Sequence, residues 1–154
     1  MRQALFDMIL HAPWGGRECV EGATVLDAFA GTGALGLEAL SRGAASATFI
    51  ENDRIALAAL RANIAVLGAT ALALAADALR PPTGQACGLV FLDPPYAAGL
   101  GPRAITALRA AGWIDDASLV VLEIGRDETV PAIGTPLAVR AFGAGQVTIW
   151  RRVG

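Results

Sequence analysis

The chain has few histidines and cysteines, the residues that bind zinc or form disulfides, and it has no lysine. Its 154 residues include one histidine and two cysteines, Cys19 and Cys87, which lie far apart. No CxxC pair or other zinc-ligand spacing occurs, so we expect no metal site. We expect both thiols to stay reduced, as in most cytoplasmic proteins. These shortages argue against a zinc enzyme and against a small disulfide-stabilised secreted domain.

Long apolar runs and an excess of positive charge are also missing. No stretch approaches the roughly 20 apolar residues of a membrane-spanning helix, and the first ten residues lack the layout of a signal peptide. We therefore expect a cytoplasmic protein with no membrane partner. The net charge is −2, and all twelve basic residues are arginine. The strong basic bias of a stand-alone nucleic-acid-binding domain is absent, which counts against such a partner.

What is present is the composition of a globular protein. The chain is 55% hydrophobic and 17% charged, and its length fits one domain over residues 1–154. Short runs that are apolar on both faces, typical of buried parallel strands, are ATVLDAF, SATFIE, ALALAAD, GLVFLD and SLVVLE. Helical segments are expected at residues 2–11, 34–42, 53–67 and 102–111.

This alternation of strands and helices predicts parallel βαβ units in an open, doubly wound α/β sheet with helices on both faces. The end of the chain differs. Residues 137–142 and 146–152 read as strands, and only three residues join them. So short a link cannot hold a crossover, so the two strands must form an antiparallel hairpin.

Carboxylates follow each of the expected parallel strands. They are Asp27, Glu51, Asp77, Asp93 and Glu123. The carboxyl ends of parallel strands share one edge of the sheet, where ligands bind in open α/β folds. Five acids at that edge would repel one another unless they accepted hydrogen bonds from a ligand or from the backbone. Some of them, Glu123 in particular, could instead have a structural role.

The first motif with a chemical reading is the glycine-rich stretch DAFAGTGALG at residues 27–36. Its glycines permit a tight strand-to-helix turn and close approach by a ligand. GTGALG alone also matches the dinucleotide pattern GxGxxG. Asp27, however, would oppose a pyrophosphate, and it suits a ligand with an ammonium and a sulfonium, as S-adenosylmethionine has. Glu51 lies 18 residues after Gly33 and can accept from ribose hydroxyls in either cofactor, and Asp77 could accept from an adenine amino group.

The second motif is Asp93-Pro94-Pro95-Tyr96, directly after GLVFL. Two prolines fix two φ angles and remove two N–H donors. The Asp93 carboxylate and the Pro94 carbonyl can therefore accept hydrogens from one amino group, which favours its nucleophilic form in the transition state. Tyr96 offers a flat face on which an unstacked base can lie. The motif predicts methyl transfer to a planar amino group.

Together these blocks resemble the bacterial RsmD family. The resemblance rests on residues 2–10, 26–44, 49–51 and 93–96, within a Rossmann-like class I methyltransferase fold of seven strands. It implies transfer from S-adenosylmethionine, without a metal, to N2 of a guanine in 16S ribosomal RNA or a small-subunit assembly particle. The cofactor-binding residues that we expect, from the resemblance and from the motifs, are Asp27, Ala28, Phe29, Gly31, Gly33, Glu51, Asn52, Asp77 and Ala78. Those expected at the target base are Asp93, Pro94, Pro95 and Tyr96.

The front of the chain departs from the family pattern, because family members carry more residues before the RxxLF segment, which here begins at Arg2. We therefore expect a monomer that binds the cofactor but holds RNA weakly. Other readings stay open at this point. They are methylation of DNA adenine or of a protein glutamine, a cofactor-binding but inactive domain, and a nicotinamide-dependent dehydrogenase, for which the catalytic residues are missing.

Overall fold

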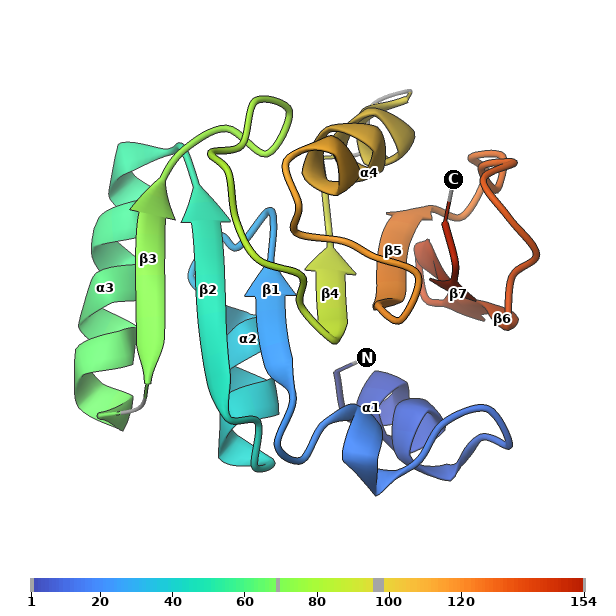
Figure 1. Cartoon of the computed structure of the whole chain (residues 1–154), viewed down its shortest axis with the longest axis horizontal. Helices are drawn as coiled ribbons and strands as arrows, with labels where there is room; N and C mark the ends of the chain where they lie inside the picture. The colour runs from blue at the N-terminus through green and yellow to red at the C-terminus, as the bar shows by residue number, and fades with distance from the viewer. Residues whose placement is uncertain (1, 69, 96–98, 154) are drawn as a thin grey trace.

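The computed structural model describes residues 2–68, 70–95 and 99–153. Seven strands form one sheet in the order β3-β2-β1-β4-β5-β7-β6. Their bounds are β1 (Thr24–Asp27), β2 (Ser46–Glu51), β3 (Ala71–Ala75), β4 (Leu89–Leu92), β5 (Leu119–Gly125), β6 (Ala138–Phe142) and β7 (Gly145–Arg151). The prediction of a mostly parallel sheet with an antiparallel hairpin at its end is confirmed (Figure 1).

Strands β1 to β5 are parallel, so their carboxyl ends meet at one edge, toward which the arrowheads in Figure 1 point. The chain order reverses between β1 and β4, which lie side by side at the centre of the sheet. In open α/β sheets a ligand binds outside the carboxyl ends of the strands at such a reversal. The topology therefore marks the ends of β1 and β4 as the place for a site.

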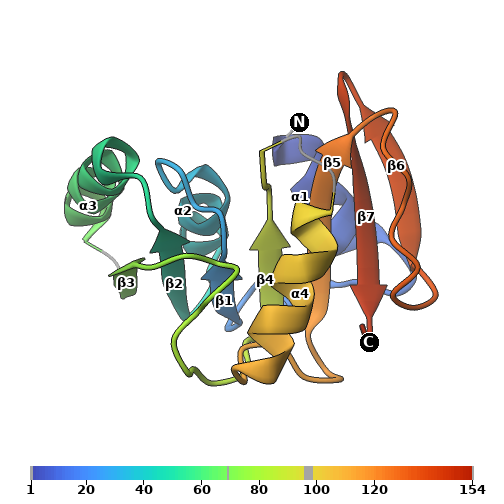
Figure 2. The same cartoon turned by 90° about the horizontal axis from the view of Figure 1, so that it is seen from above.

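Four α-helices and one short 3-10 helix accompany the sheet. They are α1 (Arg2–His11), η1 (Arg17–Cys19), α2 (Ala34–Ser41), α3 (Arg54–Leu67) and α4 (Leu100–Ala110). Helices α1, α2 and α3 cover one face and α4 covers the other (Figure 2). Neighbouring strand residues alternate between the two cores. Val25 packs with the first group of helices and Leu26 with the core beneath α4.

The ends of α3 and α4 follow from identifiable residues. Asp53 caps α3, accepting from the backbone N–H of Ala56 at 2.8 Å, and Gly68 ends it with φ of 65°. Helix α4 begins at Leu100, two residues before the expected start. Pro102 therefore occupies the first turn, where its missing N–H leaves no hydrogen bond unmade.

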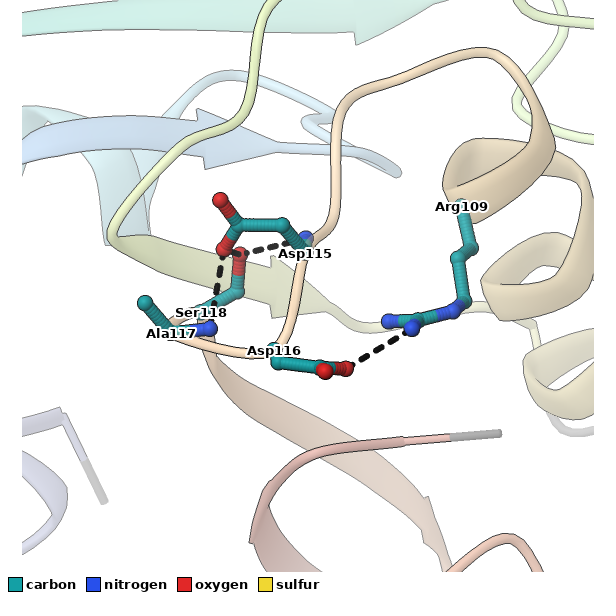
Figure 3. Close-up of polar contacts among 5 residues, drawn as sticks. All are labelled: Arg109, Asp115, Asp116, Ala117 and Ser118. Atoms are coloured by element: carbon teal, nitrogen blue, oxygen red, sulfur yellow. Dashed lines mark hydrogen bonds and ion pairs between the residues drawn. The ribbon is translucent and has the colours of Figure 1, made fainter.

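The connection from α4 to β5 fastens the start of β5 to the rest of the sheet. The Ser118 hydroxyl accepts from the Asp115 N–H at 3.0 Å and donates to the Cys87 carbonyl at 2.7 Å, just before β4. Arg109 of α4 pairs with Asp116 at 2.7 Å (Figure 3). These contacts fix β5 relative to β4, and the two strand ends beyond them carry part of the site.

Irregular segments complete the cover of the second face. Residues 76–88 connect β3 to β4 without a helix, and their Pro82 carbonyl accepts from the indole N–H of Trp113 at 2.7 Å. A Cβ on Gly84 would lie 2.1 Å from an atom of that indole ring, so only glycine lets the segment pack this closely. Within the described ranges, no helix has the length and apolar character needed to cross a membrane.

Candidate functional site

A cavity of about 550 Å³ lies at the carboxyl edge of the sheet. Five successive segments of the chain contribute to its wall, as the topology predicts. The lining residues are Ala28, Phe29 and Gly31 after β1; Ile50, Glu51 and Asn52 at the end of β2; Ala76, Asp77 and Ala78 after β3; Asp93, Pro94 and Pro95 after β4; and Glu123 in β5. The structure thus brings together most of the residues expected from the two motifs.

Glu51 fastens the glycine-rich loop to the end of β2. One carboxylate oxygen accepts from the Gly31 N–H at 2.7 Å, and the other accepts from the Asp53 N–H at 2.8 Å. Gly31 has φ of 58°, a left-handed conformation that favours glycine. Each oxygen of a carboxylate can accept more than one hydrogen bond, so Glu51 can hold the loop and still accept from a ligand in the cavity.

Asp27 lies beneath this loop rather than in the cavity wall. Its side chain is 1% exposed, and its Oδ2 accepts from the N–H of Gly36, in the first turn of α2, at 3.0 Å. Burial raises the pKa of Asp27 to about 7, with a further rise from the charges of Asp93 and Glu51 and an opposing effect of the Gly36 hydrogen bond. Asp27 therefore acts on the cavity at most through its charge and through the position of α2.

Gly33 is a second expected site residue that does not line the cavity. It is the N-cap of α2 with φ of 92°, and a Cβ there would lie 2.5 Å from Leu60. A Cβ on Gly36 would likewise lie 2.4 Å from the ring of Phe49. These two glycines let α2 approach the sheet and α3, so their role in this structure is close packing.

The segment after β3 supplies a polar and an apolar wall. Asp77 is half-buried, and its Oδ1 accepts from the Leu79 N–H at 2.9 Å. Ala78 is buried in the core beneath α4, and Asn52, which is exposed, lines the same cavity. A flat apolar ring with an amino group could lie between such walls.

Asp93 and Glu123 form an acidic pair at the ends of β4 and β5. Their side chains hydrogen bond to each other, and both face the cavity. Burial first, and the charge and hydrogen bond of Glu123 second, raise the pKa of Asp93 to about 7. Glu123 was not among the predicted site residues, although it directly follows an apolar run, as Asp93 does.

The two prolines separate this cavity from a second one of about 530 Å³. The second cavity lies between the start of α4 and the segment after β5, and its walls include Pro94, Pro95, Ile124 and Val130. Tyr96, the remaining residue of the second motif, lies outside the described residues. The rigid turn therefore has an acidic cavity on one side and a largely apolar one on the other.

The charge of the first cavity limits the ligands it can accept. Four carboxylates line it, from Glu51, Asp77, Asp93 and Glu123, and none of its lining residues that the structure describes is basic. Ionised carboxylates repel a pyrophosphate and attract a cation with hydroxyl and amino donors. These acceptors fit a positively charged nucleoside, and they fit a dinucleotide poorly.

Comparison with known proteins identifies the family. The family model described as conserved hypothetical protein 95 matches residues 1–151. Ribosomal RNA small subunit methyltransferase D of Escherichia coli K12 is 38% identical over 151 residues, which cover 96% of this chain and 73% of that protein. The chain belongs to the RsmD family. The protein of the same name from Haemophilus influenzae is 36% identical over 110 residues, covering 67% of this chain and 57% of that protein.

Solved structures share the fold of this chain. A putative methyltransferase from Escherichia coli superimposes with a TM-score of 0.83 at 35% identity, covering 99% of this chain and 84% of that one. The 16S ribosomal RNA N2 G1207 methyltransferase of Thermus thermophilus, in complex with AdoMet and guanosine, has a TM-score of 0.72 at 20% identity and covers 97% of this chain and 41% of its own. The second likeness shows the shared class I methyltransferase fold.

Proposed function

We propose that this RsmD-family chain transfers a methyl group from S-adenosylmethionine to an exocyclic amino group of a nucleic-acid base, namely N2 of a guanine in 16S ribosomal RNA. The observation that carries the proposal is the acidic cavity that ends at the Asp93-Pro94-Pro95 turn. The names of the RsmD relatives support ribosomal RNA of the small subunit as the substrate. The Thermus thermophilus structure, with its guanosine, supports guanine N2 as the acceptor.

In this proposal the acidic cavity holds S-adenosylmethionine. Glu51 accepts from the ribose hydroxyls, and Asp77 accepts from the adenine amino group, with Asn52 and Ala78 beside the ring. The loop of Ala28, Phe29 and Gly31 faces the methionine part, and Gly33, packed against Leu60, holds that loop in place. The buried charge of Asp27 favours the ammonium and sulfonium of the cofactor. The bound cofactor supplies a methyl group on a positively charged sulfur. Its charge and its hydroxyl and amino donors suit the carboxylates that line the cavity.

The rigid turn after β4 positions the acceptor amine. The Asp93 carboxylate and the Pro94 carbonyl accept its two hydrogens, and Pro94 and Pro95 offer no N–H to compete. Tyr96 completes this subsite as a stacking platform for the base. The amine lone pair forms the new N–C bond as the S–C bond breaks, and one amine proton is then lost to solvent or to Asp93. Positioning and electrostatic stabilisation are the contributions of the chain.

The neighbouring apolar cavity gives the target base a place beside this turn, since a base must leave its stack to reach such a site. We include in the proposal that residues 1–154 act as one domain and a monomer, in the cytoplasm, on ribosomal RNA or on a small-subunit assembly particle. Methylation of DNA or protein is then not expected.

The experiment uses methyl-labelled S-adenosylmethionine with unmethylated 16S ribosomal RNA and, separately, with the assembled small subunit. Digestion and mass spectrometry should find N2-methylguanosine at one position. Replacing Asp93 with alanine should abolish it, and Glu21→Ala, remote from the cavity, should not. A product methylated at adenine N6, or no product from a chain that binds the cofactor, would overturn the proposal.

Cofactor binding is tested separately by calorimetry. We expect S-adenosylmethionine to bind the wild-type chain and the Glu21→Ala variant alike. Glu51→Ala should weaken binding by about tenfold or more, because it removes ribose acceptors and releases Gly31. Equal affinity in all three proteins would show that the cavity is not the cofactor site.

A further inference from the structure

Glu123 also lines the cavity, and the proposed methyl transfer assigns it no role. Strands β4 and β5 are parallel, with Leu92 paired to Leu122, so Asp93 and Glu123 occupy the next position along the two strands. Adjacent strands lie about 4.8 Å apart. The two carboxylates therefore stand side by side, hydrogen bonded to each other and facing the same cavity.

Two neighbouring acceptors match only one kind of amino-bearing base edge. In guanine, the 2-amino group is next to N1–H, so the Watson–Crick edge presents two adjacent donors. In adenine and cytosine, the ring nitrogen next to the amino-bearing carbon on that edge carries no hydrogen. This nitrogen is therefore an acceptor. A carboxylate placed beside the amine subsite would bond to the first edge and repel the lone pair of the second.

We propose that Glu123 is the specificity-determining residue of this site, accepting from guanine N1–H while Asp93 accepts from the 2-amino group. The inference rests on the proposed function and deepens it, since it assigns the choice of guanine over other amino-bearing bases to one side chain. If the bound base has no hydrogen for Glu123 to accept, the carboxylate is buried without that donor, which costs free energy. Glu123 therefore weakens the binding of other bases as well as strengthening the binding of guanine.

The surroundings of the pair favour a base edge that brings hydrogen-bond donors. The charged groups that face the pair are acids, with Asp27 behind Asp93 and no basic side chain in the described cavity wall. Guanine brings two donors to the pair, whereas a base with a lone pair on the neighbouring ring nitrogen would bring a further acceptor next to Glu123.

The test replaces the target base rather than the protein alone. The guanine that wild type methylates is first located by mass spectrometry in a synthetic 16S ribosomal RNA fragment. That fragment is then compared with one that carries 2-aminopurine in place of this guanine. The analogue keeps the 2-amino group but has no hydrogen on N1. We expect wild type to prefer guanine in kcat/KM by about 10- to 100-fold. Glu123→Leu should reduce this preference to within about threefold, and Glu21→Leu should keep it in full.

The conservative variant separates this role from a structural one. Glu123→Gln keeps an oxygen that can accept from N1–H while its amide donates to Asp93, so it should retain part of the preference. A folded Glu123→Gln that discriminates no better than Glu123→Leu, although it still carries the acceptor oxygen, would overturn the inference.

Cofactor binding and thermal unfolding of each variant show whether it is folded. If wild type makes no N2-methylguanosine, the proposed function itself fails. If wild type makes it, and folded Glu123→Leu discriminates against 2-aminopurine as strongly as wild type, only the role of Glu123 is overturned. Should Glu123→Leu not fold, the wild-type comparison decides the matter, and equal kcat/KM on guanine and 2-aminopurine overturns the inference.

Discussion

Asp27 carries the free-energy cost of holding a carboxylate inside the protein. Its side chain has one backbone donor, the Gly36 N–H at 3.0 Å, and burial outweighs that hydrogen bond, so the pKa of Asp27 rises from 3.8 to about 7. A group whose pKa is raised by folding contributes most to stability when it is protonated. The contribution of Asp27 is fully present below its unfolded pKa and is lost as the pH rises through about 7.

Replacing Asp27 with asparagine should remove this pH dependence. The amide oxygen of the substituted side chain can still accept from Gly36, and no charge is buried. We expect Asp27→Asn to be more stable than wild type at about pH 8, by an upper limit of roughly 4 kcal/mol, and to lose that advantage at about pH 4. Urea unfolding at the two pH values measures the difference. An advantage of equal size at both would contradict the assignment to the carboxylate charge.

The sequence predicts residues whose position follows from the end of a strand, and it does not predict residues whose position depends on helix packing. The places of Glu51 and Asp93 in the cavity wall were predictable, because each lies at or just after the end of a parallel strand and β-sheet geometry brings those ends together. The direction of the Asp27 side chain depends on how closely α2 approaches β1, which the sequence does not encode locally. The same holds for Gly33, whose spacing matches a ligand loop but whose missing Cβ makes room for Leu60.

At the scale of elements, α2 lies unusually close to the strand beside it. Gly36 is buried within this helix, where alanine normally favours helix formation by about 1 kcal/mol. Here a Cβ would lie 2.4 Å from the ring of Phe49, whose side chain is fully buried. The aromatic ring has no free space into which it can turn, so packing overrides propensity at this position.

Gly36→Ala should therefore lower stability even though it raises helix propensity. Overpacking of this kind costs about 1–3 kcal/mol, measured as a drop in the midpoint of urea unfolding. Gly68→Ala is the matched control, because Gly68 has φ of 65° but open space around its missing Cβ, so it reports backbone strain alone. If Gly36→Ala were as stable as wild type, the packing of α2 against Phe49 of β2 would have room for a methyl group, which would contradict this prediction.

The helices and strands themselves were predictable, and the reason lies in their patterns. The four helices and seven strands lie close to the expected ranges, since short apolar runs bounded by turn residues leave few alternatives. The long connections, residues 76–88 and 126–137, have no such pattern. Their places depend on contacts distant in sequence, such as the bond from Trp113 to the Pro82 carbonyl.

For the whole molecule, the distribution of charge sets how RNA can be held. Four carboxylates line the cavity at one edge of the sheet, Asp27 is buried beside them, and the chain has a net charge of −2. Phosphates must therefore be met by arginines around an acidic site. Arg126 is exposed, directly follows β5, and its Nη1 donates to the Gly143 carbonyl at 3.1 Å. It thus stands at the same edge as Asp93 and Glu123. None of the ion pairs in the described part of the chain includes Arg126.

Such a surface predicts weak RNA binding with a shallow dependence on salt. In a filter-binding titration of a 16S ribosomal RNA fragment between about 50 and 200 mM salt, the slope of log affinity should correspond to few phosphate contacts, each contributing about 0.7 for single strands. Arg126→Ala should lower the slope by about that amount, and Arg17→Ala, placed before β1 at the opposite edge, should not. Tight binding with a steep slope, unchanged in Arg126→Ala, would place the RNA on another surface, because counterion release reports the contacts that the bound phosphates make.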